Sequence, residues 1–315
     1  MNKDTFIKFL SAFELSRHKI SKILEEMGGE YEFQRFYLSD AVEKILGNNY
    51  TEIAHKSNQK YFDAYLNRLE EKGIGLITIE DERYPERLKQ LDDPPFYLYY
   101  KGDITLINQK SVSIVGTRSP SSYGIVVTER FASQLAEAGA VIVSGLAYGV
   151  DSIAHRKALD VQGKTIAVLA GGFDNIYPPQ HLSLFEEIAQ KGLVLTEHRP
   201  DIKNQKYYFV ERNRIVAALG ESLLITEAGA QSGTFITKDF AMDLGRPIYA
   251  VPGNITSHKS DGTNTLLISG QCNFALDPLL LIEELGLKKI VSQKNSNFES
   301  DEEKLSNYYK MAPRT

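Results

Sequence analysis

The chain has 315 residues, of which 42% are hydrophobic and 24% are charged, so it is long enough for about two domains with ordinary cores. No apolar run reaches the length of a membrane span, and the single cysteine, Cys272, excludes both an intramolecular disulfide framework and a cysteine-based zinc site. The net charge of −5 argues mildly against nucleic acid as a partner, so a polyanion would need a local basic patch. We therefore expect a cytoplasmic protein that does not enter a membrane.

The first 72 residues are predicted to form a small helical domain. Segments such as "RHKISKILEEM" and "NQKYFDAYLNRLEE" place apolar residues three and four positions apart, with glycine breaks between the segments. This region holds eleven Lys or Arg and twelve Asp or Glu residues, so its charge does not predict a nucleic-acid-binding arm. A docking module is the simpler interpretation.

Residues 73–107 connect this domain to the rest of the chain through two strand-like runs, around Leu76–Ile79 and Phe96–Tyr100. Pro94 and Pro95 favour extended backbone just before the second run. We expect this segment to pack on the domain that follows, and not to be a free linker.

Residues 108–288 are predicted to form an α/β domain. Six apolar runs alternate with helical patterns, and the runs are "SVSIVG", "AVIVSGL", "KTIAVLAGG", "GLVLTEH", "SLLITEA" and "PIYAVPG". Continuous Val, Ile and Leu is typical of strands covered on both faces. The alternation predicts a doubly wound, mostly parallel sheet whose ligands bind at the carboxyl ends of the strands. A last helix is expected in "DPLLLIEELG", followed by a polar tail over residues 289–315.

Almost every predicted strand ends in small or polar residues. These include Gly116, Thr117, Arg118 and Ser119 after the first strand, Ser144 and Gly145 after the second, and Ser232, Gly233 and Thr234 after "SLLITEA". Glycine lets backbone N–H groups approach an anion, and the N-terminus of the next helix adds partial positive charge. A single turn of this kind is more often only a tight connection. Several at one sheet edge, with an arginine among them, predict an anion-binding rim.

The segment "KNQKYYFVERNRIVAALG" places cations beside aromatic residues. The cations are Lys206, Arg212 and Arg214, and the aromatic residues are Tyr207, Tyr208 and Phe209. This combination suits single-stranded nucleic acid, because cations hold phosphates and aromatic rings stack on bases. In the alternative interpretation the aromatic residues are core anchors, the arginines pair with Glu211 or Glu227, and an ordinary helix begins near Arg212. For the aromatic residues the sequence leaves both interpretations open. For the cations it favours binding of nucleic acid.

Catalytic and metal-binding patterns are weak. The six histidines show no metal-ligand spacing such as H-E-x-x-H, so we expect neither a metal nor a cofactor. Asp151 and His155, four positions apart, predict a pair on a helix surface. Glu227 at a strand end is a candidate general base, or a residue that orients Arg212 or caps a backbone amide.

Taken together, the motifs resemble the DNA-processing protein A (DprA/Smf) family over about residues 75–285. They are "SIVGTR", "SGLAYGVDSIAH", "GGFDNIYPPQH", "FVERNRIVAALGESLLITEAGAQSGT" and "GRPIYAVPG". The resemblance implies an extended Rossmann-like domain that binds single-stranded DNA without catalysis, after a small N-terminal SAM-like helical domain. Family members dimerise through the Rossmann-like domain, protect incoming DNA and load the RecA recombinase on it in natural transformation. The implied partners are single-stranded DNA, RecA, single-strand-binding protein and a second copy of the chain.

The resemblance also assigns DNA contacts to this sequence. They fall on Arg118, on Ser144 and Gly145, on Lys206 and Phe209 with Arg212 and Asn213 beside them, and on the turn of Ser232, Gly233 and Thr234; Gly116, Thr117 and Ser119 complete the first turn. Two features depart from the family. Pro179 stands where many members have a Lys or Arg, and residues 289–315 are too few for the C-terminal winged helix that many members carry.

Two alternatives remain at this point. The first is an enzyme of the nucleotide phosphoribohydrolase type, or a nucleotide sensor, on a related Rossmann-like fold. That enzyme signature, P-G-G-x-G-T-x-x-E, is not matched by "TEAGAQSGTFIT". The second concerns Leu266, Leu267 and Ile268, which form either a dimer interface or an interior helix.

Overall fold

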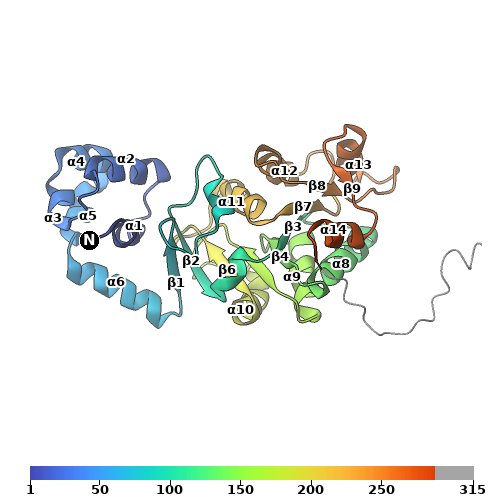
Figure 1. The fold of residues 1–315 in the computed structure, drawn as a ribbon, viewed down its shortest axis with the longest axis horizontal. Helices are drawn as coiled ribbons and strands as arrows, with labels where there is room; N and C mark the ends of the chain where they lie inside the picture. Colours follow the sequence, from blue (N-terminus) through green and yellow to red (C-terminus); the bar gives the residue numbers. More distant parts are fainter. Residues whose placement is uncertain (288–315) are drawn as a thin grey trace, which may run out of the picture.

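The computed structural model describes residues 1–287, which form an N-terminal helical module followed by an α/β domain (Figure 1). The helices of the module are α1 (Lys3–Ser11), α2 (Arg17–Met27), α3 (Phe33–Leu38), α4 (Asp40–Leu46), the 3₁₀ turn η1 (Gly47–Asn49), α5 (Tyr50–Lys56) and α6 (Gln59–Glu71). Asn2, Ser16 and Asn58 cap α1, α2 and α6, because each side chain accepts a hydrogen bond from an amide of the first turn. The polar residues between the apolar stripes therefore fix where these helices begin.

The α/β domain is built on a single sheet of nine strands in the order β1-β2-β6-β5-β4-β3-β7-β8-β9. The strands are β1 (Gly75–Thr78), β2 (Tyr97–Gly102), β3 (Ser111–Val115), β4 (Val141–Ser144), β5 (Thr165–Val168), β6 (Leu193–Thr196), β7 (Ser222–Ile225), β8 (Ile248–Ala250) and β9 (Asn273–Phe274). The strands β3 to β9 are parallel to one another, and β2 pairs antiparallel with both β1 and β6. The chain thus forms an α/β, Rossmann-like fold with a mostly parallel sheet.

The strand order reverses beside β3. The chain builds outward through β4, β5 and β6 and then crosses back to β7, which pairs with β3 on its other side. The crossing element is α11 (Lys206–Leu219). In open α/β sheets a crevice opens outside the carboxyl ends of the strands at such a switch point.

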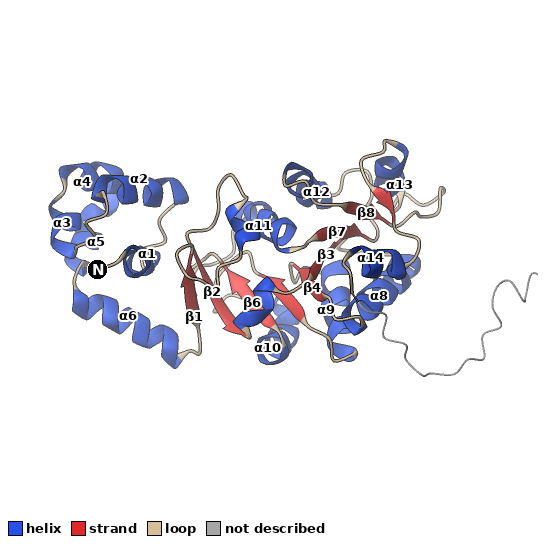
Figure 2. Ribbon diagram, viewed as in Figure 1, coloured by secondary structure: helices blue, strands red, loops and turns tan. Residues whose placement is uncertain are grey.

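Helices cover both faces of the sheet (Figure 2). The remaining helices are α7 (Glu86–Lys89), η2 (Ile104–Asn108), α8 (Ser122–Glu137), α9 (Val150–Asp160), η3 (Pro179–His181), α10 (Leu182–Lys191), α12 (Thr234–Asp243), α13 (Asp261–Ile268) and α14 (Pro278–Glu284). Val141 and Val143 of β4 share a buried cluster with α11 and α12, whereas Ile142 shares one with α8, α9 and α14. Because successive strand residues face opposite sides of the sheet, a strand covered by helices on both faces is apolar along its whole length.

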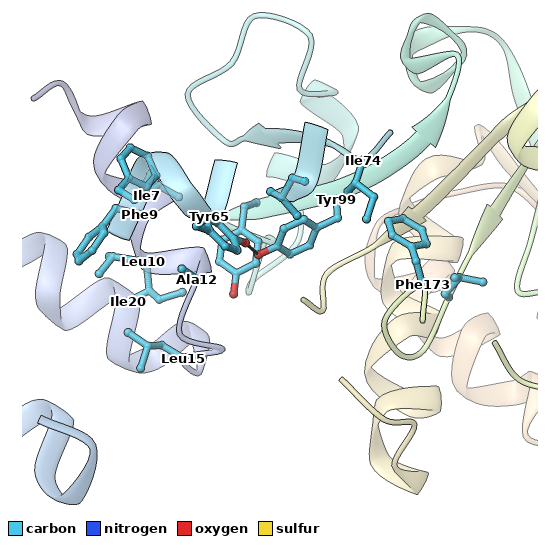
Figure 3. Packing of buried hydrophobic residues seen from close by; sticks show 14 of the residues in the cluster. Ile7, Phe9, Leu10, Ala12, Leu15, Ile20, Tyr65, Ile74, Tyr99 and Phe173 are labelled. Atoms are coloured by element: carbon cyan, nitrogen blue, oxygen red, sulfur yellow. Dashed lines mark hydrogen bonds between the residues drawn. The ribbon is translucent and has the colours of Figure 1, made fainter. Parts of the chain in front are cut away.

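The helical module packs on the edge of the sheet formed by β1 and β2 (Figure 3). Tyr99 of β2 is fully buried, and its hydroxyl donates a 2.9 Å hydrogen bond to the backbone oxygen of Ser11. The same hydroxyl lies 2.5 Å from that of Tyr65 on α6. The aromatic rings of α1, including Phe6 and Phe9, belong to the same buried cluster as these tyrosines. The module and the sheet therefore share one core.

The predicted strands and the observed ones agree closely. The six apolar runs form β3 to β8, whereas the two-residue edge strand β9 was not predicted. In the alternative interpretation of the sequence a helix begins near Arg212, whereas α11 begins at Lys206. Leu266 and Leu267 are buried within the chain, while Ile268 is 88% exposed.

The polar tail predicted over residues 289–315, and its boundary at 288, lie outside the described residues. Within residues 1–287, none of the helices combines the length and the apolar character that a bilayer crossing requires.

Candidate nucleic-acid interface

A cleft of about 420 Å³ lies at the switch point of the sheet. Its walls are the loops after β3, β4 and β7 and one side of α11. The predicted site residues that line it are Gly116, Thr117, Arg118, Phe209, Arg212, Asn213, Ser232, Gly233 and Thr234. The fold thus brings together three separate segments of the sequence, residues 116–118, 209–213 and 232–234.

Arg118 supplies the exposed cation of this cleft. Its guanidinium carbon lies 5.8 Å from the centre of the Phe209 ring, which is half-buried on the first turn of α11. Cation–π attraction at this distance holds the Arg118 side chain near the ring and leaves the hydrogen-bond donors of the guanidinium free. A positive charge is therefore presented to solvent beside an aromatic face.

Arg212 supplies a second, buried cation. Its Nη1 donates hydrogen bonds to the backbone oxygens of Gly145 and Val168, at the ends of β4 and β5. It pairs with neither Glu211 nor Glu227, so the structure does not have the ion pairs of the alternative interpretation. Burial lowers the pKa of Arg212 to about 10, which leaves the guanidinium protonated at neutral pH. Arg212 thus places a buried positive charge in the lining of the cleft.

Asp151 and His155 are not a surface pair, as the sequence had indicated, because the start of α9 is packed against the sheet. Asp151 is 8% exposed and His155 is fully buried. The Asp151 carboxylate accepts hydrogen bonds from the amides of Gly145 and Ala147, at 3.1 and 3.3 Å. Burial raises the pKa of Asp151, and the charge of Arg212 opposes that rise. Asp151 also lines the cleft, and its spacing alone gave no indication of this.

The other predicted contacts lie outside the lining of the cleft. Ser144 is fully buried and its hydroxyl donates a 2.7 Å hydrogen bond to the backbone oxygen of Ile114. Lys206 is exposed at the first position of α11. Ser119 is exposed next to Arg118, and its backbone oxygen accepts a hydrogen bond from the Lys259 ammonium at 2.7 Å. Lys206 and Ser119 are close in sequence to the cleft residues Phe209 and Arg118, whereas the Ser144 hydroxyl is bonded within the sheet.

The glycines of the rim differ in whether packing requires them. A Cβ at Gly116 would lie 2.6 Å from the Val150 side chain, and one at Gly145 would overlap the Arg212 guanidinium. At these two positions glycine is needed for packing within the protein. A Cβ at Gly233 would meet nothing within 4 Å. Of these three, only Gly233 leaves open space in which a ligand can approach the backbone.

Glu227 caps the helix that follows β3. Its carboxylate accepts hydrogen bonds from the amide and the hydroxyl of Ser121, at 2.8 and 2.5 Å, and it is 1% exposed. This is one of the alternatives that the sequence had left open for Glu227. Arg214, one of the predicted cations, is also buried, and it pairs with Glu197 and Asp93 on the side of α11 away from the cleft.

A second cavity, of about 720 Å³, lies between the helical module and the sheet domain. Its lining includes the carboxylates of Glu14, Asp92, Asp93, Glu197 and Glu211. Arg17 pairs with three of these, but acids still outnumber arginines and lysines in the lining. A polyanion is repelled from such a surface. Although it is larger, this cavity is not the candidate nucleic-acid site.

Metal ligands do not assemble in the described part of the chain. Among residues 1–287 no group of three or more His, Cys, Asp or Glu side chains is placed to hold a metal ion.

Comparison with known proteins places the α/β domain in a family. The family model for DNA recombination-mediator protein A matches residues 75–286. The chain is 40% identical over 201 residues to DNA processing protein DprA of Bacillus subtilis, an alignment that covers 64% of this chain and 68% of that protein. Across its curated relatives the matched share of their length ranges from 56% to 89%.

Two solved structures are also similar. The X-ray structure of DNA processing protein A from Streptococcus pneumoniae superposes with a TM-score of 0.75 at 32% identity, covering 90% of this chain and 99% of that one. A structure of DNA processing protein A from Helicobacter pylori, described for its single-stranded DNA binding mode, superposes with a TM-score of 0.61 at 37% identity. This match covers 67% of this chain and 95% of that one. The family match spans about two thirds of the sequence and includes every wall of the cleft. The chain belongs to the DNA recombination-mediator protein A (DprA) family.

Proposed function

We propose that the chain binds single-stranded DNA along the cleft at the switch point and performs no chemistry on it. The observation that carries this proposal is the convergence of Arg118, Phe209 and the open turn at Gly233 on one cleft. A cation, an aromatic face and an accessible backbone are the components that bind unpaired strands without sequence preference. The binding of single-stranded DNA by the Helicobacter pylori relative supports the same assignment.

The charge distribution supports binding of phosphates in spite of the net charge of −5. Arg118 and the buried Arg212 both line the cleft, where Asp151 is the acidic residue that faces them. The positive charge of Arg212 acts on the Asp151 carboxylate and offsets part of the repulsion that it exerts on a phosphate. The N-termini of α9 and α12 at the edge of the cleft add partial positive charge.

The biological role that we propose is that of a mediator, which protects single-stranded DNA and helps to load the RecA recombinase on it in the presence of single-strand-binding protein. This role rests on family membership. A homodimer is part of the same proposal. Of the three residues predicted for its interface, Ile268 has the exposure that a partner requires.

The direct test is fluorescence anisotropy with labelled oligothymidylate of about 20 nucleotides, a length that spans more than one single-fold footprint. We expect binding that weakens steeply as salt increases, because phosphate contacts release counterions. Absence of binding at low salt would contradict the proposal. RecA loading is tested separately, by measuring RecA ATPase activity on DNA coated with single-strand-binding protein, with and without the chain.

The enzymatic alternative has its own test. Glu227 is committed to capping α8, and the chain lacks the Pro-Gly-Gly and the glutamate of the phosphoribohydrolase signature. Incubation with nucleoside monophosphates should therefore release no free base. Sustained base release by purified protein would favour the enzyme over the binding protein.

A further inference from the structure

Two exposed tyrosines lie beside the cleft, in the loops that follow β4 and β5. Tyr148 is 39% exposed and Tyr177 is 48% exposed. Neither lines the cleft itself, and neither is among the predicted DNA contacts. Both rings therefore present aromatic surface to water at the margin of the cleft.

Tyr177 extends the aromatic surface that begins at Phe209. The centres of these two rings are 5.5 Å apart and the ring planes meet at 74°, an edge-to-face contact. On the cleft side, the same Phe209 ring receives the Arg118 guanidinium. Arg118, Phe209 and Tyr177 therefore form a continuous row, because Phe209 contacts both of the others. Edge-to-face contact fixes the orientation of a ring while much of its surface stays accessible.

Tyr148 is held against the same loop as Tyr177. Its hydroxyl donates a 2.5 Å hydrogen bond to Oε1 of Gln180, three residues after Tyr177. Its ring meets the buried His181 edge to face, with the ring centres 5.2 Å apart. His181 is in turn anchored, since its Nδ1 lies 2.9 Å from the backbone oxygen of Leu146. Both tyrosines are thus positioned by one short segment, residues 177–181.

We propose that Tyr177 and Tyr148 form a base-stacking subsite that carries the DNA strand from Phe209 out of the cleft. The ligand class is successive unpaired nucleobases, bound through their faces and without sequence preference. This inference rests on the proposed function. DNA is favoured over a protein partner because the row starts at a cation and an aromatic face inside the cleft. The carboxylate of Asp174 in the same loop is neutralised by Lys72, 2.7 Å away, so it repels a phosphate less.

The test compares two ligands of equal length and charge. One is oligothymidylate of about 20 nucleotides, and the other is the same backbone with abasic sites in place of the bases. Tyr177→Ala should weaken binding of the base-containing strand by about 5- to 100-fold and leave binding of the abasic strand unchanged. Tyr177→Phe keeps the ring and should bind both ligands as the unaltered chain does. Tyr148→Ala should show the same base-dependent loss as Tyr177→Ala.

A matched control is available on α11. Tyr207 is 52% exposed but lines the acidic cavity on the other side of that helix, so Tyr207→Ala should leave both affinities unchanged. Thermal melting establishes that each variant folds. The subsite is refuted if Tyr177→Ala and Tyr148→Ala bind oligothymidylate normally, which would leave the rings to a protein partner. It is also refuted if they lose affinity equally for both ligands, which would indicate a role in holding the loop. Failure of the unaltered chain to bind oligothymidylate would instead overturn the proposed function.

Discussion

Gly145 and Arg212 fit together only because position 145 has no side chain: a Cβ there would lie 2.1 Å from Nη1 of Arg212. The guanidinium fills that space and donates hydrogen bonds to the backbone oxygens of Gly145 and Val168. These contacts tie α11, which crosses the sheet, to the ends of β4 and β5. The glycine therefore positions Arg212 in the lining of the cleft, and a direct contact of Gly145 with DNA stays a prediction.

The first prediction concerns this contact. Gly145→Ala should displace the guanidinium and leave buried carbonyl groups without a donor, at a cost of about 2–4 kcal/mol in the free energy of unfolding. Urea denaturation measures this loss. The matched control is Gly233→Ala, where φ is −60° and a Cβ meets nothing within 4 Å, so unfolding should change by less than about 1 kcal/mol. Equal stability of both variants would show that Arg212 can move at no cost.

The second prediction concerns Arg118. Its side chain is exposed and forms no hydrogen bond within the described part of the chain, so Arg118→Ala should leave thermal stability unchanged. If the guanidinium contacts a phosphate, the plot of log K against log salt should become less steep by about 0.7. Arg130→Ala is the control, since Arg130 is also exposed but pairs with Asp277, the residue that caps α14. An identical salt dependence in all three proteins would remove Arg118 from the DNA site.

The third prediction is a pH dependence of stability that originates at His155. Thr165 donates its hydroxyl proton to the backbone oxygen of Ile142 and so accepts from Nδ1 of His155, 2.6 Å away. The other ring nitrogen, Nε2, is buried and has no partner among the described residues. Burial, together with the charges of Arg212 and His181, lowers the pKa of His155 to about 3. The native state therefore holds a neutral ring where the unfolded state binds a proton below about pH 6.5.

Because the folded pKa is lowered, the stability from His155 is present above pH 6.5 and is lost as the pH falls toward 3. Removing the titrating group with His155→Asn should flatten this dependence. Between pH 6.5 and 4.5 the unfolding free energies of the two proteins should converge by up to about 1.4 kcal/mol per pH unit. Chemical denaturation at several pH values measures the difference. Parallel curves would mean that the native state accepts a proton at this position.

The sequence predicts the strands of this fold well because most of them are covered on both faces. In β3 to β8 every residue is buried, so the apolar runs are continuous and hard to mistake. The edge strand β9 has two exposed residues and no such pattern. The start of α11 was missed for a related reason. Its first turn, from Lys206 to Phe209, has Tyr207 exposed and Tyr208 packed against His198, so no single apolar stripe runs through it.

The location of the candidate site could be predicted from the sequence, but the burial and the contacts of each residue could not. The alternation of strands and helices predicts a parallel sheet, and a parallel sheet brings the turns after its strands to one edge. Burial depends on how α11 and α9 rotate against the sheet, which spacing alone does not fix. Arg118 and Arg212 are the same residue type, yet one is exposed beside a ring and the other is buried against backbone oxygens. Asp151 was predicted on a helix surface, yet it is buried and lines the cleft.

The last prediction concerns the homodimer. Ile268 ends α13 with 88% of its surface exposed, close in sequence to Phe274 of the edge strand β9 and to Leu276, which are also exposed. If this edge of the sheet is the dimer interface, Ile268→Glu places a charge in it and should produce a monomer at micromolar concentration. Size-exclusion chromatography with light scattering measures the mass directly. Ile255→Glu is the control, because Ile255 is 89% exposed on the loop after β8 and its replacement should leave the dimer intact. Dissociation by both variants would point to a general effect of added charge, and dissociation by neither would place the interface elsewhere.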